Sequence, residues 1–125
     1  MIHVCPDTIK TFYKIVGPDR FMIITDALKI KHDTSDTFQL FGLDCVRKNG
    51  AAYLTTGPLA GSLLTMDQGI RNIRDITGAS LIDLMKISSY NASNSIHMHD
   101  IGALEVNKKA DIVLLNDDLQ VNVVD

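Results

Sequence analysis

The apolar run Phe-Met-Ile-Ile at 21–24 constrains the fold of this chain more than any other feature. A short, continuous apolar run predicts a β-strand that is buried on both faces, which is typical of parallel sheets. Apolar spacing before it predicts a helix over 7–16 that begins at Asp7 and ends at Gly17, and residues 2–4 have the spacing of a strand end. The order strand, helix, strand is a βα unit and predicts the α/β class.

Turn-forming residues divide the rest of the chain into short elements. The pair Asn49-Gly50 tolerates the positive φ angles of a type I′ turn and predicts a β-hairpin over 38–54. Glycines and capping residues mark the helix ends. The other expected elements are loops at 29–37, 55–62 and 90–100, helices from Thr65 to Gly78 and from Ser80 onward, and strands over 110–115 and 119–123.

The composition excludes several classes of function. The 125 residues suit one domain, and 12 Lys and Arg against 15 Asp and Glu leave no dominant basic patch for nucleic acid. No apolar run reaches the roughly 20 residues that span a bilayer, so we expect no membrane segment. The first residues do not have the pattern of a secretion signal, which makes the cytoplasm the expected location. In that location Cys5 and Cys45 are expected to be free thiols.

Asp26 is the first candidate for chemistry, because it directly follows the apolar run. The carboxyl end of a parallel strand is where active sites of α/β proteins are built. The alternative is a turn or helix cap, since Thr-Asp-Ala can simply open a loop, and spacing alone favours this interpretation. His3 lies at a similar position one βα unit earlier, and it could equally be a surface histidine.

Two further segments are weaker candidates. The small residues of Pro58-Leu59-Ala60-Gly61-Ser62 let a backbone approach a ligand closely, but the loop has no P-loop pattern and could be a connector. His97-x-His99-Asp100 resembles part of a metal site, yet zinc requires three or four ligands with defined spacing, so a solvated loop is the better interpretation. Ser88, Ser89 and Ser93 lack the G-x-S-x-G elbow of a serine nucleophile.

Taken in order, the motifs resemble the C-terminal part of the N-acetylglucosamine-6-phosphate deacetylase family, within the metal-dependent amidohydrolase superfamily. The resemblance covers nearly all of this chain but only about the last third of such an enzyme. The combination of LAGS-x-LTMD with ITDA is specific to this family, whereas KKADIVLL is shared more widely. The motifs are IHV-x-P (2–6), ITDAL (24–28), the Asn-Gly hairpin, LAGS-x-LTMDQGIRN (59–72), ISSYNA (87–92) and GALEVNKKADIVLLNDDLQV (102–121).

The resemblance implies a fold. Residues 1–100 would be the last βα units of a TIM-like amidohydrolase barrel, with a β-hairpin insertion at about 38–54. Residues 101–125 would be strands of the small β-sandwich that accompanies the barrel.

The resemblance also implies site residues. Asp26 would be the catalytic base that takes a proton from the attacking water and passes it to the departing amine. His3 would contact the sugar phosphate, and the backbone of Leu59, Ala60 and Gly61 would contact the substrate. The reaction would release acetate from a small amino-sugar phosphate and leave glucosamine 6-phosphate, and the enzyme would be a homo-oligomer.

The implied cofactor is a divalent metal ion, Zn, Fe or Mn, that polarises the acetamide carbonyl and acidifies a bound water. Its family ligands, a Glu and two His, lie on earlier barrel strands, and His32, His97 and His99 do not match them. The phosphate-binding arginine is also upstream. We therefore expect this chain alone to be inactive. Two alternatives stay open: a non-catalytic, self-associating α/β module, or an amidohydrolase for another N-acyl sugar.

Overall fold

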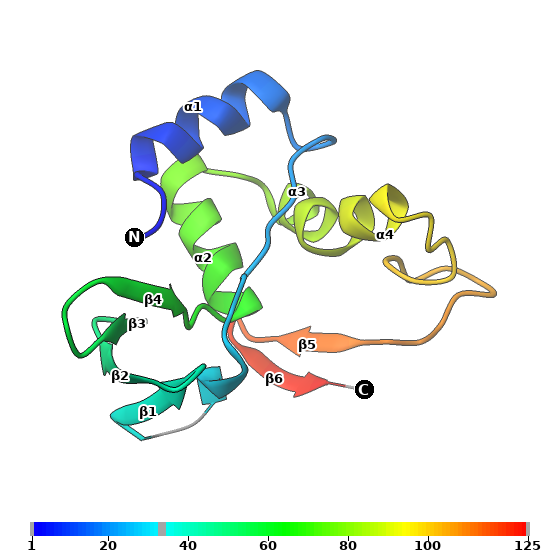
Figure 1. Ribbon diagram of the computed structural model, residues 1–125. Coiled ribbons are helices and arrows are strands. Elements are labelled where there is room, and N and C mark those ends of the chain that lie inside the picture. The colour runs from blue at the N-terminus through cyan, green and yellow to red at the C-terminus, as the bar shows by residue number, and fades with distance from the viewer. Residues whose placement is uncertain (1, 33–34, 125) are drawn as a thin grey trace. The chain divides into compact units, whose positions relative to one another are not determined.

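The computed structural model of the protein describes residues 2–32 and 35–124, so positions 33 and 34 of the expected loop at 29–37 lie outside the described residues. The chain divides into two compact units. The helical unit contains residues 3–24 and 66–124, and the sheet unit contains residues 25–65. Figure 1 shows the order of the elements along the chain. None of the described helices is long and apolar enough to cross a lipid bilayer.

The helical unit begins with α1, Pro6–Val16, which ends at Gly17 as predicted. The start differs from the prediction. Cys5 occupies the N-cap position without a side-chain cap, and Asp7 lies in the first turn. Proline in the first turn begins this helix, because its fixed φ angle is already helical and its missing N–H is not needed there. Residues 2–4 form no strand, so the predicted strand end is wrong.

The apolar run at 21–24 is extended but is not a strand, which corrects the central prediction. Phe21 and Ile23 are buried, whereas Met22 and Ile24 are exposed, so the run has one buried face instead of two. The N–H of Ile23 donates to the carbonyl of Ile87 at 2.9 Å. A strand needs a neighbouring strand for its ladder of hydrogen bonds. No described strand pairs with this run.

Further helices follow in the helical unit over residues 66–95. The predicted helix ends are confirmed: Gly78 follows the first helix, and the Ser80 side chain caps the second by accepting from the Asp83 N–H at 3.2 Å. The predicted loop at 90–100 is partly wrong, because the helix continues to Ser95 before the chain becomes irregular. The elements are α2 (Met66–Thr77), α3 (Leu81–Met85), the π-helical η2 (Lys86–Tyr90) and α4 (Asn91–Ser95).

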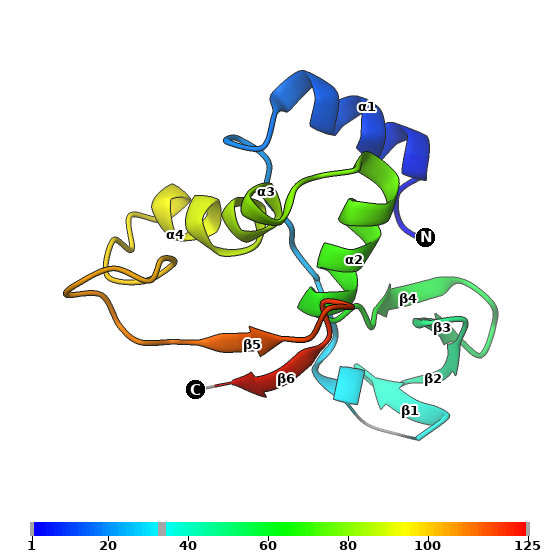
Figure 2. The same cartoon turned by 180° about the vertical axis from the view of Figure 1, so that it is seen from behind.

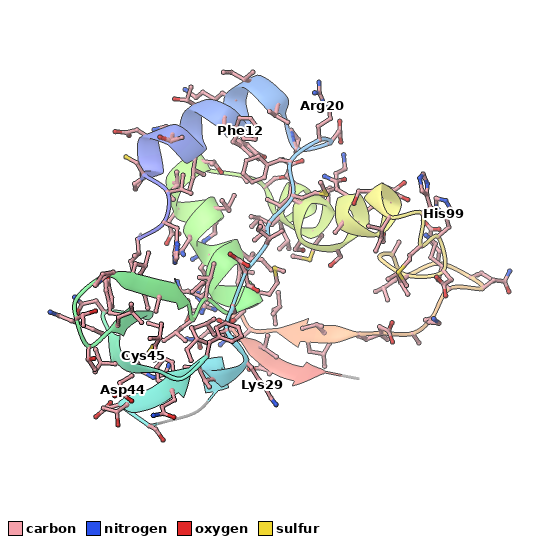
Figure 3. The ribbon with its side chains drawn as sticks, viewed as in Figure 1. Phe12, Arg20, Lys29, Asp44, Cys45 and His99 are labelled. Carbon is pink, nitrogen blue, oxygen red and sulfur yellow. The ribbon has the colours of Figure 1, made fainter. Side chains whose placement is uncertain are left out.

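One hydrophobic core joins these helices to the extended run. Phe21 is its aromatic centre, with ring centres 5.9 Å from Phe12 and 5.4 Å from Tyr13 of α1 (Phe12 is labelled in Figure 3). Leu84 and Ile87 are the most deeply buried large aliphatic side chains. The buried cluster consists of Phe21, Ile23, Ile70, Ile73, Leu84, Ile87 and Leu119.

The helical unit ends in an antiparallel hairpin of β5, Val113–Leu115, and β6, Val121–Val124. Its turn is closed by the side chain of Asn116, whose Oδ1 accepts from the Gln120 N–H at 2.8 Å. This confirms the two strands predicted at the end of the chain, although β5 is shorter than the predicted 110–115.

The sheet unit contains the short 3-10 helix η1 (Lys29–His32) and an antiparallel sheet of order β1-β2-β3-β4, seen from both sides in Figures 1 and 2. The Asn49-Gly50 hairpin is confirmed, with φ angles of 51° and 78°. The predicted loop at 55–62 is partly wrong, because its second half forms β4. The strands are β1 (Thr37–Leu40), β2 (Leu43–Lys48), β3 (Ala51–Leu54) and β4 (Leu59–Ser62).

The α/β class is therefore confirmed, but both described sheets are antiparallel. Parallel pairing is limited to a single bridge between Ala27 and Ser62 within the described ranges. The two cysteines are free thiols as expected, with Cys5 exposed and Cys45 buried on β2, where Figure 3 labels it.

Candidate functional site

Asp26 lies where the extended run enters the sheet unit. Its φ angle is 45°, in the left-handed region that a non-glycine residue adopts at some cost, and its side chain is exposed. Directly after it, Ala27 forms a parallel bridge with Ser62, and the N–H of Leu28 donates to the Ser62 carbonyl at 2.9 Å. These contacts hold the Asp26 backbone beside the end of β4.

Strand β4 contributes the predicted Leu59-Ala60-Gly61 segment. Gly61 pairs with Ala52 of β3 and Leu59 with Tyr53, so the register shift between these pairs leaves Ala60 without a partner on β3. Such a bulge re-aims the backbone locally and is common beside functional sites. Ser62 is buried, and its Oγ accepts from the Leu64 N–H at 3.1 Å. One end of β4 is thereby fixed while its middle is irregular.

Gly61 allows the close approach of the two segments. A Cβ added at this position would lie 2.9 Å from Cγ and from one Cδ of Leu28, which is too close for unshifted atoms. The absence of a side chain therefore lets Leu28 pack against β4 and brings Asp26 to the same edge. Asp26, Leu59, Ala60 and Gly61 were predicted from distant parts of the chain, and the sheet unit brings them together.

His3 belongs to the helical unit. It lies in a bend before α1, and its side chain is exposed.

The described residues do not fit a divalent-metal centre. In residues 2–32 and 35–124, no group of three or more His, Cys, Asp or Glu side chains could hold a metal ion. His97 and His99 do approach one another, with ring centres 6.1 Å apart. The neighbouring Asp100 pairs with Lys109 at 2.8 Å, and the hydrogen bond from that ammonium lowers the pKa of the Asp100 carboxyl.

Two features of the structure were not anticipated from the sequence. Asn91 Nδ2 donates to the carbonyls of Pro18 and Phe21, at 2.7 and 2.8 Å, and so fixes the start of the extended run. An asparagine within a helix gives no sign of partners some 70 positions away. The second feature is a pocket of about 340 Å³ on the sheet unit, lined by Val46, Lys48, Asn49, Tyr53, Leu54, Thr55 and Gly57.

Comparison with known proteins confirms the resemblance that the motifs indicated. A sequence model of the amidohydrolase family matches residues 19–125. An N-acetylglucosamine-6-phosphate deacetylase of Lysinibacillus sphaericus is 36% identical over 118 residues, covering 94% of this chain and 30% of that relative. An N-acetylgalactosamine-6-phosphate deacetylase of Shewanella sp. (strain ANA-3) is 27% identical over 122 residues, covering 98% of this chain and 31% of the relative.

The same relationship holds for the fold. The crystal structure of the N-acetylglucosamine-6-phosphate deacetylase of Thermotoga maritima has a TM-score of 0.86 and 32% sequence identity, over 98% of this chain and 34% of that one. The chain thus spans about a third of the length of the relatives that it matches.

Proposed function

Because the chain belongs to the amidohydrolase family, we propose that it is the C-terminal part of an N-acetylglucosamine-6-phosphate deacetylase. Residues 1–100 would contribute the last βα units of a TIM-like barrel, and residues 101–125 would contribute strands of the adjoining β-sandwich. The proposed reaction hydrolyses the acetamide of N-acetylglucosamine 6-phosphate to acetate and glucosamine 6-phosphate.

The observation that carries this proposal is the parallel bridge between Ala27 and Ser62. The bridge supports a shared site for Asp26 and the Leu59-Ala60-Gly61 backbone. Asp26 is the group expected to act on the substrate, and the backbone segment is expected to hold it. The Asp26 side chain is exposed, and it makes no hydrogen bond or ion pair with the residues that the structure describes. A carboxylate in this state can accept a proton from a water molecule.

Asp26 acts twice in the proposed mechanism. Its carboxylate first takes a proton from water as the water oxygen forms a bond to the acetamide carbon. The same proton then passes to the amide nitrogen as the carbon–nitrogen bond breaks, so that acetate and the free amine leave. The backbone of Leu59, Ala60 and Gly61 positions the sugar, and the irregular register at Ala60 leaves groups of this segment available for hydrogen bonds. His3 contacts the phosphate.

Enzymes of the amidohydrolase family are typically metal-dependent. Since the described residues do not supply three ligands, we assign no metal ligand to them. The chain by itself is proposed to be inactive.

Complementation tests this proposal. The chain is co-expressed with the upstream part of the Lysinibacillus relative, and acetate release from N-acetylglucosamine 6-phosphate is measured with the complex and with the chain alone. We expect turnover only in the complex, and Asp26→Asn should lower it by about 10²- to 10⁴-fold, the usual contribution of a general base. Asp44→Asn, at another exposed carboxylate of the sheet unit, is the matched control and should leave turnover unchanged. Full activity in the Asp26→Asn complex would refute the assigned role.

Specificity for a different amino sugar is the second candidate, because the Shewanella relative is an N-acetylgalactosamine-6-phosphate deacetylase. The two sugars differ in one hydroxyl configuration. Comparing kcat/KM for both phosphates in the same complex decides between them. A preference for the galactosamine substrate would replace the first assignment while leaving the role of Asp26 intact.

A non-catalytic, self-associating module is the candidate from another class. Large apolar side chains are exposed in each unit, including Ile15 and Ile24, at 77% and 76%, in the helical unit and Phe41, at 97%, in the sheet unit. Exposed apolar surface of this kind favours association. If analytical ultracentrifugation shows that the chain alone self-associates, and complementation fails, the module is supported over the enzyme.

A further inference from the structure

The pocket on the sheet unit contains none of the residues assigned to the deacetylase reaction. Its volume is about 340 Å³, and its lining residues lie between positions 46 and 57, on β2, β3 and the turns that follow them (Figure 1). Ligand pockets in proteins usually have volumes of about 300 to 1,000 Å³. This pocket therefore has room for one small molecule.

Strand pairing sets the shape of the pocket. Val46 of β2 lies directly opposite Tyr53 of β3, so these two side chains share one face of the sheet. Lys48 is two residues beyond Val46 on the same strand, and alternate residues of a strand point to the same face. The pocket runs along β3, whose four residues span about 10 Å at the usual rise of a strand.

Backbone contacts hold both ends of this stretch. At the start of β3, the Asn49-Gly50 turn joins it to β2. At its end, the N–H of Thr55 donates to the carbonyl of Asp44 at 2.9 Å, and the N–H of Gly57 donates to the carbonyl of Leu54 at 2.8 Å. A ligand would therefore meet a largely preformed pocket, which lowers the entropic cost of binding.

Four polar side chains of the lining have hydrogen-bonding groups that the folded chain does not use. The Lys48 ammonium makes no ion pair with the residues that the structure describes. Within the same residues, the side chains of Asn49, Tyr53 and Thr55 make no hydrogen bond. One amide, two hydroxyls and one ammonium thus line a single small pocket and can bind a polar ligand.

The charge of the lining indicates the sign of the ligand. Among the described lining residues, Lys48 is the one charged side chain. The nearest carboxylate along β2, Asp44, is outside the lining and accepts a hydrogen bond from Gln39 Nε2 at 3.0 Å. A lysine ammonium binds phosphate or carboxylate as a compact positive charge.

The remaining lining supplies apolar surface. Val46 and Leu54 are both half-buried, so part of each aliphatic side chain is available to the carbon skeleton of a ligand. We propose that this pocket binds a small hydroxylated organic anion, such as a monosaccharide phosphate or a sugar acid. Lys48 holds the anionic group, and the neutral polar side chains hold the hydroxyl groups.

An NMR titration of the ¹⁵N-labelled 125-residue chain tests the proposal. The probes are glucose 6-phosphate, glucuronate and uncharged glucose. We expect the amide signals of residues 46–57 to shift with at least one of the two anions, and to shift far less with glucose at the same concentration. The anion that binds more tightly identifies the ligand class as a phosphate or a carboxylate.

Substitutions assign the binding to the pocket. Lys48→Met removes the charge but keeps a long side chain, and it should weaken binding of the anion by about five- to tenfold. Lys29→Met is the matched control, because Lys29 is an exposed lysine of the sheet unit outside the lining (labelled in Figure 3), and it should leave binding unchanged. Tyr53→Phe removes one hydroxyl with little change in shape and should weaken binding by about two- to tenfold.

Three results would overturn the proposal. The first is the absence of shifts at residues 46–57 with both anions. The second is equally tight binding of glucose, since Lys48 would then hold no anionic group. The third is equal weakening by Lys48→Met and Lys29→Met, which would indicate attraction to the overall charge of the chain instead of binding in the pocket.

Discussion

Replacing Asn91 by alanine is expected to destabilise the helical unit by about 1 to 3 kcal/mol, because a typical hydrogen bond contributes about 0.5 to 1.5 kcal/mol and this change removes two. The Asn91 amide donates to the carbonyls of Pro18 and Phe21 at 2.7 and 2.8 Å, in a partly buried position. These carbonyls precede and begin the extended run that carries Phe21 into the core. Without the Asn91 amide, both carbonyls lose this hydrogen-bond donor.

Asn91→Asp distinguishes hydrogen bonding from packing. The aspartate has nearly the same size, but its ionised carboxylate has no hydrogen to donate and would face two carbonyl oxygens. We expect it to be at least as destabilising as alanine. Asn94→Ala is the matched control, since it removes the same type of side chain from the same helix. The Asn94 side chain makes no hydrogen bond to the residues that the structure describes. This control should change stability by less than about 0.5 kcal/mol.

Urea denaturation followed by circular dichroism measures these differences. For a chain of this size, 1 kcal/mol corresponds to a shift in Tm of about 3 to 5 °C, so thermal melts provide a second readout. The reasoning is refuted if Asn91→Ala and Asn94→Ala unfold at the same urea concentration. It is also refuted if Asn91→Asp is as stable as the unchanged chain at neutral pH, since packing alone would then account for Asn91.

Two more substitutions test local features of the fold by the same denaturation assay. Gly102→Ala should cost about 2 to 4 kcal/mol, because a Cβ there would overlap Ser93 Oγ and lie 2.9 Å from Ser93 Cβ, at a φ of 85°. Gly50→Ala, at φ 78° with no atom within 4 Å, should cost only about 1 to 2 kcal/mol, and equal losses would contradict the clash. Ser80→Ala should cost about 1 kcal/mol through loss of the cap on the Asp83 N–H, whereas Ser80→Asn, which can also accept from that N–H and donate to the Asp83 carboxylate, should retain most of the stability; equal losses would exclude capping as the reason.

The parts of the fold that follow from neighbouring residues were predictable. Gly17 and Gly78 end helices, and Ser80 begins one, because each acts on backbone groups within about one helical turn. The turn at Asn49 and Gly50 sets the register of its hairpin in the same local way. The error at Asp7 is also local, since a proline one residue earlier begins the helix.

The sheet contacts were less predictable, because a strand depends on partners far along the chain. The run at 21–24 is apolar enough for a strand, yet its hydrogen bonds within the described residues do not form a ladder. The LAGS segment contains small residues typical of a loop, but β3 pairs with it and makes it a strand. The composition of a segment is compatible with more than one secondary structure, and pairing with another strand decides which one forms.

The candidate site also has features that follow from the sequence and features that only the folded chain shows. The sequence by itself determined that a carboxylate, Asp26, follows an apolar run and that a glycine, Gly61, lies in a segment of small residues. Only the tertiary structure decided that these residues lie together, because the bridge between Ala27 and Ser62 joins positions 35 apart in the chain. The packing of Leu28 over Gly61, which a side chain at Gly61 would prevent, is likewise visible only once the chain has folded.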